Sequence, residues 1–136
     1  MTLEELEKAL PKIREKASVS YPWLSLKGLK YETINKIHNG GNYKLRSLYR
    51  YLDLLAYVLR IDGQLAEDLQ TFGQIMREKR IAAGLTVVDI CSQAHCTAKA
   101  IYDLEGGKGS QRSTLLSFIS CIGGVSFSIH EMIDEL

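Results

Sequence analysis

Residues 28–40, Gly-Leu-Lys-Tyr-Glu-Thr-Ile-Asn-Lys-Ile-His-Asn-Gly, have a related stretch sixty-seven positions later that includes residues 97–107, Thr-Ala-Lys-Ala-Ile-Tyr-Asp-Leu-Glu-Gly-Gly. The apolar and glycine positions recur without a gap: Ile34, Ile37, Gly40 and Leu48 correspond to Ile101, Leu104, Gly107 and Leu115. Each copy combines a short amphipathic segment with a glycine that can end a helix and a second apolar segment. The sequence therefore predicts one small helical unit that occurs twice.

Length and composition agree with two such units. The chain has 136 residues, of which 46% are hydrophobic and 24% are charged, which suits one ordinary core or two small ones and excludes a disordered chain. We expect an all-α fold with two tandem units of four to five helices each. The predicted boundaries are 1–62 for the first unit, 63–70 for a connector and 71–136 for the second unit.

The expected helices follow from capping residues and apolar spacing. In the first copy they run from Thr2 to about Lys16, from Ser20 onward, from Lys30 to His38 and from Leu45 to Leu59. Pro11 should kink or restart the first of them, and Asp62-Gly63 ends the pattern. In the second copy the expected helix starts are Thr71, Thr86, Thr97 and Ser113, followed by a last helix from Ser128 to about Glu135. The connector carries Leu65, Ala66 and Leu69 at helical spacing and should pack between the units.

The cysteines and the start of the chain predict a cytoplasmic protein. Cys91, Cys96 and Cys121 lack C-x-x-C spacing, so we expect buried free thiols in a reducing compartment. No apolar run reaches the roughly 18 residues needed to cross a bilayer. Residues 2–5 form a helix cap and not a basic signal sequence, so we expect neither export nor membrane insertion.

Charge is unevenly distributed along the chain, although the net charge is only +1. Residues 27–50 contain one acid, Glu32, and six basic residues: Lys27, Lys30, Lys36, Lys44, Arg46 and Arg50. The matching window, residues 94–117, carries a net charge of +1. Acidic residues gather instead at both termini and in the connector. The distribution predicts one basic face, and such a face is the electrostatic signature of a nucleic-acid partner.

Three motifs of the second copy resemble a known family. They are Lys79-Arg80-Ile81-Ala-Ala-Gly84-Leu85, Asp89-Ile90-Cys91 and Ile101-Tyr-Asp-Leu104-Glu105-Gly-Gly107. Through them residues 71–133 resemble the helix-turn-helix domain of the lambdoid phage repressor and Cro group, also called the Xre family. Residues 17–59 resemble it more distantly and depart from it at Trp23 and His38.

Arg80 and Glu105 are predicted to pair. Both are flanked by apolar residues, so each would be costly to bury alone, and the resemblance implies a structural ion pair between the first helix and the recognition helix. The gap-free alignment puts Ile13 and His38 at these positions of the first copy. We therefore expect the first copy to be held by packing, with Trp23 and the tyrosines as substitutes.

The resemblance also implies which residues would contact DNA. In the second copy these are Val87, Thr97, Ala98, Lys99, Tyr102, Asp103, Lys108, Ser110 and Arg112. In the first copy they are Ser20, Lys30, Tyr31, Glu32, Asn35, Lys36, Asn42, Lys44 and Arg46. Val87 and Ala98 cannot hydrogen-bond a base, whereas the first set offers four cations for phosphates and polar groups for base edges. The second copy matches the family better, but the first copy has the better chemistry for binding DNA.

Two functions from different classes stay open. One is a sequence-specific regulator that binds double-stranded DNA, as a phage or mobile-element repressor or autoregulator. The other is a protein-interaction module of helix-turn-helix fold, acting as an antitoxin, antiactivator or inhibitor on a protein partner. We expect no enzyme, because no nucleophile has a recognisable base, and no metal or cofactor, because the histidines lack ligand spacing.

The oligomeric state follows from the same repeat. A monomer with two units could imitate an asymmetric dimer, whereas a homodimer would carry four units. We favour the homodimer, because the C-terminal segment offers more apolar surface than a small unit needs. The residues that suggest it are Phe127, Ile129, Met132 and Ile133.

Overall fold

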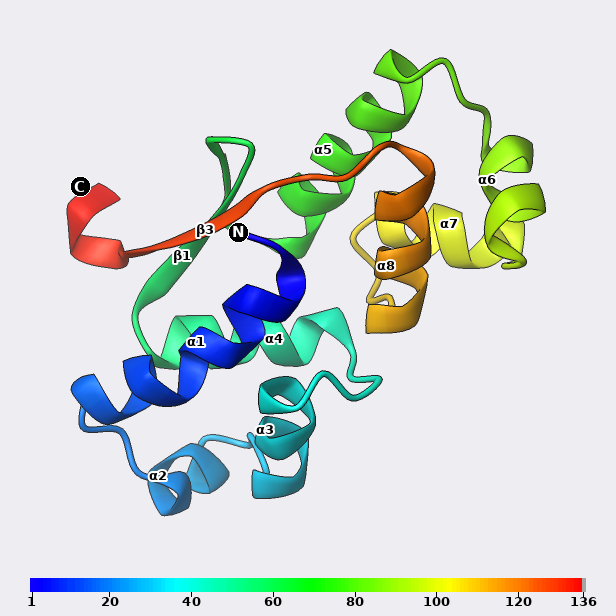
Figure 1. The fold of residues 1–136 in the computed structure, drawn as a ribbon. Helices are drawn as coiled ribbons and strands as arrows, with labels where there is room; N and C mark the ends of the chain where they lie inside the picture. Colours follow the sequence, from blue (N-terminus) through cyan, green and yellow to red (C-terminus); the bar gives the residue numbers. More distant parts are fainter. Residues whose placement is uncertain (136) are drawn as a thin grey trace.

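The computed structural model describes residues 1–135, in which two halves share one order of elements, four helices followed by a strand (Figure 1). The first half comprises α1 (Leu3–Lys16), α2 (Tyr21–Leu26), α3 (Tyr31–His38), α4 (Leu45–Leu54) and β1 (Tyr57–Ile61). The short strand β2 (Gln64–Ala66) follows it. The second half comprises α5 (Leu69–Ala82), α6 (Val87–Ala94), α7 (Ala98–Glu105), α8 (Arg112–Cys121) and β3 (Phe127–Glu131), and the 3₁₀ helix η1 (Met132–Glu135) comes last.

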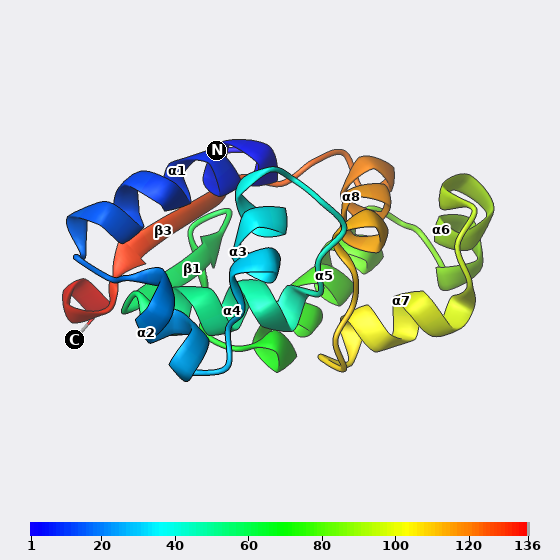
Figure 2. The same cartoon turned by 90° about the horizontal axis from the view of Figure 1, so that it is seen from below.

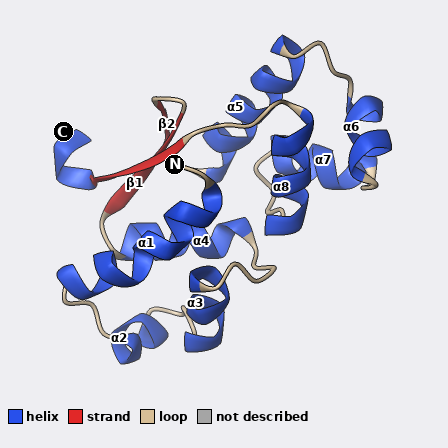
Figure 3. Ribbon diagram, in the orientation of Figure 1, coloured by secondary structure: helices blue, strands red, loops and turns tan. Residues whose placement is uncertain are grey.

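The expectation of an all-α fold is wrong, because three antiparallel strands form a sheet in the order β2-β1-β3 (Figure 3). Leu59 pairs with Ala66 of β2 on one side and with Ile129 of β3 on the other. The range expected as a connector therefore contributes β2. Because β3 pairs with β1, the two halves are joined through one sheet.

Local backbone geometry explains why the fourth helix stops before Leu59. Ala56 has φ +61°, which no α-helix accommodates, so α4 ends at Leu54. Asp62 and Gly63 both have positive φ, of +49° and +80°. That combination suits a two-residue hairpin turn, which returns the chain antiparallel to β1. Leu65 and Ala66 of the connector thus lie in strand β2, whereas Leu69 begins α5, so the three apolar residues do not share one helix.

The expected C-terminal helix starting at Ser128 is also wrong. Phe127 is fully buried and Ile129 packs against the core, so alternate side chains point inward as they do in a strand. Five residue pairs join β3 to β1, between Tyr57 and Glu131 at one end and Ile61 and Phe127 at the other. Only η1, after Glu131, is helical.

The helix caps decide where the other helices begin. The Thr2–Glu5 capping box is present, and α1 continues through Pro11 without a break. The second expected box, Thr86–Asp89, is present as well. By contrast α5 begins before Thr71, because the Asp68 side chain accepts a hydrogen bond from the Thr71 amide and acts as the cap. Likewise α8 begins at Arg112, one residue before Ser113.

Equivalent residues of the two halves meet each other. The central pair of the β1–β3 ladder, Leu59 and Ile129, occupies the third position of each strand. A second antiparallel bridge joins Lys44 to Gln111, which are the N-cap residues of α4 and α8. Antiparallel pairing between equivalent segments is the pattern produced by an approximate two-fold axis. In Figures 1 and 2 the sheet lies toward the left and α7 toward the right, and in Figure 1 α3 lies below the sheet.

Candidate nucleic-acid interface

The exposed face of α3 combines cations with hydrogen-bonding side chains. Ile34 and Ile37 are fully buried and fix the rotation of the helix. The side chains on the opposite face are exposed, and the predicted contact residues among them are Lys30, Tyr31, Glu32, Asn35 and Lys36. This spacing covers one side of a helix, so these groups can address one common ligand. The Asn39 amide donates to Asn35 Oδ1 at 2.9 Å, which orients the Asn35 side chain.

The α7 face has the same geometry but weaker polar chemistry. Ile101 and Leu104 of α7 are buried, like Ile34 and Ile37 of α3. Tyr102 is 61% exposed. Thr97 caps the helix through a hydrogen bond from the Ala100 amide. Lys99 pairs with Asp103 at 2.8 Å on the same helix. Most of the positive charge on this face is therefore neutralised locally.

The turns that precede α3 and α7 each contain a residue with positive φ, but the residue differs. Gly28 has φ +89° before α3, and His95 has φ +53° before α7. Glycine adopts a left-handed conformation without steric cost, whereas the Cβ of histidine makes this conformation unfavourable. Each turn sets the angle between a short helix, α2 or α6, and the helix that follows. Helix-turn-helix proteins place the second helix of such a pair against DNA.

Six exposed cations occur between the end of α2 and the middle of α4, and we call them the basic ridge. Its members are Lys27, Lys30, Lys36, Lys44, Arg46 and Arg50. Arg50 donates to the Lys27 carbonyl at 2.8 Å, which holds that guanidinium near the end of α2. Arg46 and Arg50 also line a hollow together with Gly28 and Leu29. The ridge thus places several cations beside the polar face of α3. On the second half Lys108 is exposed after α7, without an equivalent ridge around it.

Arg112 is partly buried, and its guanidinium is engaged by Glu7. Its Nε and Nη2 donate to the two carboxylate oxygens of Glu7 at 2.6 and 2.9 Å. Tyr43 donates a short hydrogen bond to the same carboxylate, and Glu7 is 1% exposed. Burial and the neighbouring Glu7 raise the pKa of Tyr43, and the hydrogen bonds that Arg112 donates to Glu7 raise the pKa of Arg112. The predicted DNA contact from Arg112 therefore competes with a buried ion pair between the halves.

Asn42 also has partners across the contact between the halves. Its side-chain amide donates to Gln111 at 3.0 Å, and its carbonyl oxygen accepts from the Ser113 amide at 3.0 Å. Two backbone hydrogen bonds close the same junction, from Leu45 to Ser110 and from Arg112 to Tyr43. Asn42 is thus fixed at the junction although it is exposed. The sequence alone gave no signal for this contact, since it joins segments far apart in the chain.

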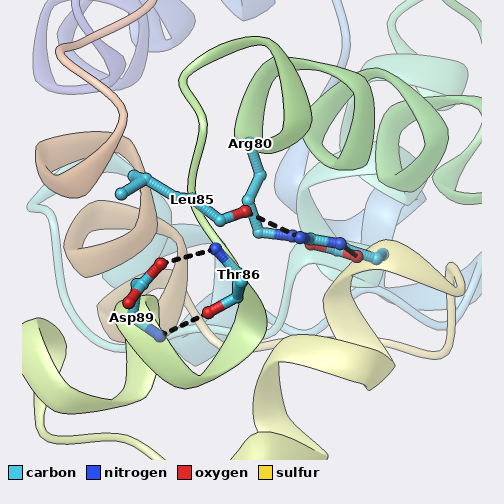
Figure 4. Close-up of polar contacts among 5 residues, drawn as sticks. Arg80, Leu85, Thr86 and Asp89 are labelled. Atoms are coloured by element: carbon cyan, nitrogen blue, oxygen red, sulfur yellow. Dashed lines mark hydrogen bonds and ion pairs between the residues drawn. The ribbon is translucent and has the colours of Figure 1, made fainter.

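The structure brings Arg80 and Glu105 together in a buried bidentate pair. Arg80 Nε lies 2.7 Å from Glu105 Oε2, and its Nη2 lies 3.0 Å from Oε1. A third hydrogen bond runs from Arg80 Nη1 to the Leu85 carbonyl, beside the Thr86–Asp89 capping box (Figure 4). One side chain thereby fixes α7 and the start of α6 relative to α5.

In the first half Arg14, and not Ile13, is the counterpart of Arg80. Arg14 Nη1 donates to the Val19 carbonyl at 2.7 Å, as Arg80 Nη1 does to Leu85. Its guanidinium lies 4.0 Å from the centre of the Tyr21 ring, and its buried Nε has no hydrogen-bond partner among residues 1–133. The gap-free alignment missed this match because the α1-to-α3 spacing is one residue shorter than the α5-to-α7 spacing. His38 occupies the position of Glu105 and hydrogen-bonds to Tyr51 at 2.8 Å.

Other candidate chemistry is sparse in the described part of the chain. Cys91, Cys96 and Cys121 are free and half-buried. No group of three or more His, Cys, Asp or Glu side chains within residues 1–133 is arranged to hold a metal ion. No helix in that range is long and apolar enough to cross a membrane. A scan with protein-family models, a search of curated proteins and a search of solved structures each give no match.

Proposed function

We propose that this chain binds double-stranded DNA sequence-specifically and regulates transcription in the cytoplasm. The observation that carries the proposal is the exposed polar face of α3 beside the basic ridge. Phosphate contacts from Lys and Arg provide affinity and position, and side chains on a helix in the major groove read bases. Asn35 and Lys36 supply hydrogen-bond donors for the acceptor atoms on adenine and guanine edges.

A salt titration of DNA binding tests the proposal. Fluorescence anisotropy with a duplex from the region upstream of the chain's own coding sequence should show affinity that falls steeply with salt. Lys44→Ala or Arg46→Ala should weaken all sequences alike and reduce the log–log salt slope by about one for each lost phosphate contact. Lys36→Ala or Asn35→Ala should instead reduce the preference for the specific duplex. Lys16→Ala at the end of α1 is the matched control, because it removes an exposed cation outside the basic ridge. Absence of salt-dependent binding below micromolar concentration would reject the proposal.

A protein-interaction module is the second candidate, and the surface of the second half favours it. Val88 on α6 is 74% exposed, Ile81 on α5 is 54% exposed and Tyr102 on α7 is 61% exposed. Exposed apolar side chains thus occur on α5, α6 and α7, while Lys99 on α7 is paired with Asp103. If DNA binding fails, Val88→Ser is the variant that should reduce binding to a protein partner.

A further inference from the structure

We propose that one copy of this chain occupies both halves of a single DNA site, with α3 facing one half-site and α7 the other. The inference rests on the proposed DNA-binding function and specifies its stoichiometry and the form of its target. Repressors of the helix-turn-helix type place two equivalent helices in successive major grooves by forming dimers. Here the second helix is part of the same chain.

The first support is the placement of the approximate two-fold axis. It passes through the Lys44–Gln111 bridge at one level and through the Leu59–Ile129 pair at another. The bridge directly follows the loops that leave α3 and α7, whereas the sheet lies on the opposite side (Figure 1). A two-fold axis keeps equivalent elements at the same level along it. α3 and α7 therefore flank the same end of the molecule, as one straight duplex requires.

The second support is that Phe127 and Ile129, half of the apolar surface expected to join two chains, are used within one, whereas Met132 and Ile133 after the strand stay 39% and 70% exposed. Phe127 is 2% exposed and Ile129 packs against the core, since β3 completes the sheet with β1. The Met1 carbonyl accepts a 2.7 Å hydrogen bond from the Phe127 amide and covers the start of that strand. The strand pairing that could join two subunits is thus already satisfied between the two halves.

The third support is that the two halves are locked and not merely tethered. The Glu7–Arg112 pair and the Asn42 contacts join them at the α3 and α7 end. Asp62 and Lys79 form an ion pair near the sheet, where the Asp62 side chain also accepts from the Ser126 amide at 2.8 Å. Contacts at both ends of the axis fix the separation of α3 and α7. A fixed separation selects one spacing between the half-sites.

The fourth support concerns sequence asymmetry of the target. The α3 face presents Asn35 and Lys36 where the α7 face presents Tyr102 and Asp103. Amide and ammonium groups match purine edges, whereas a phenol ring contributes contact area and one hydrogen bond. The two half-sites must therefore differ in sequence. The target is a non-palindromic site whose two parts lie about 34 Å apart, one turn of the duplex.

The experiment selects duplexes from a randomised pool with the full chain and then measures the mass of the complex by sedimentation velocity. We expect one 15.3 kDa chain for each selected duplex and two dissimilar conserved blocks about one turn apart. In the selected duplex, Lys36→Ala should remove the preference in one block only, and Tyr102→Ala in the other only. Each mismatch in a block should weaken the wild-type chain on the order of tenfold. Lys16→Ala should leave both blocks and the stoichiometry unchanged.

The outcomes separate this inference from the function on which it rests. Two chains on each duplex with a palindromic site would overturn the inference while leaving DNA binding intact. A single block affected by both variants would overturn it as well, because α3 and α7 would not address separate half-sites. No enrichment of any sequence and no salt-dependent binding would reject the proposed function, and the inference with it.

Discussion

In the second half a buried bidentate ion pair, Arg80 with Glu105, joins α5 to α7, whereas the first half places Arg14 and His38 at the same positions. Arg14 keeps the hydrogen bond to the loop after its helix and stacks on Tyr21, and His38 forms a hydrogen bond with Tyr51. The same arrangement of helices is therefore stabilised by electrostatics in one half and by aromatic packing in the other. The ion pair is not required by the architecture, and its loss matters only where its partner remains buried.

The largest expected effect is the loss of the second half's ion pair. Arg80→Ala or Glu105→Ala should each lower the free energy of unfolding by about 3 kcal/mol or more, because each leaves the other charge buried without its partner. Urea denaturation measures this loss. The control is Lys99→Ala, which removes an exposed pair worth about 0.5 kcal/mol at most. Equal losses from Arg80→Ala and Lys99→Ala would show that the pair has no special role.

A somewhat smaller effect is expected at the contact between the halves. Arg112→Leu should cost about 2–3 kcal/mol, because Glu7 stays buried with only Tyr43 as a donor. Leucine is the residue at the equivalent position 45, so the replacement suits the local fold. The double variant Glu7→Ala, Arg112→Leu should recover part of the loss, since no buried charge remains. Additive losses in this double-mutant cycle would contradict a direct pair.

The two turn residues should respond in opposite directions. His95→Gly should raise the free energy of unfolding by up to about 1 kcal/mol, because glycine relieves the left-handed strain. Gly28→Ala should lower the free energy of unfolding by about 1 kcal/mol, because alanine is strained at a positive φ. A Cβ at Gly28 meets no atom within 4 Å, so no steric clash adds to this loss. Thermal unfolding of both variants gives the comparison. A loss from His95→Gly would mean that the imidazole makes a stabilising contact.

The smallest effect is a pH dependence confined to the first half. Burial, together with the positive charge of Arg14, lowers the pKa of His38 from its ordinary value near 6.5. As the pH drops below 6.5, His38 of the unfolded chain is protonated before His38 of the folded chain. The free energy of unfolding should therefore fall with decreasing pH until the lowered pKa is passed. His38→Gln should flatten this part of the stability profile while keeping a hydrogen bond to Tyr51. An unchanged slope in that variant would exclude His38 as its source.

The helices could be predicted from the sequence. The sequence also contains signals for the strands of the sheet. Leu52, Leu55 and Leu59 fit helical spacing, but Leu59 and Ile61 equally fit the alternation of a strand. Asp62-Gly63 is a hairpin signal, but the same two residues also end a helical pattern. Ser128 and Glu131 imitate a capping box, whereas Phe127 and Ile129 alternate as a strand does. In each case local spacing was ambiguous, and pairing across the chain decided the structure.

The candidate site was only partly predictable, for a different reason. The exposure of Lys36 and Lys44 follows from the apolar pattern around them, because that pattern fixes which side of each helix is buried. The partner of Arg112 could not be found in this way, since Glu7 lies 105 residues earlier in the chain. A one-residue difference in spacing also hid the match between Arg14 and Arg80. Contacts between distant segments need three-dimensional coordinates.

The pairing of β1 with β3 also bears on how the chain reaches its native state. Leu59 meets Ile129 only after the chain has closed a loop of seventy residues, and most of the second half lies inside that loop. Contacts so distant in sequence raise the contact order, which slows folding relative to helical bundles of similar size. During synthesis β1 leaves the ribosome well before β3 is made. Until then β1 can pair only with the short strand β2, and its other edge stays unpaired. Refolding in vitro should therefore be limited by closure of this sheet.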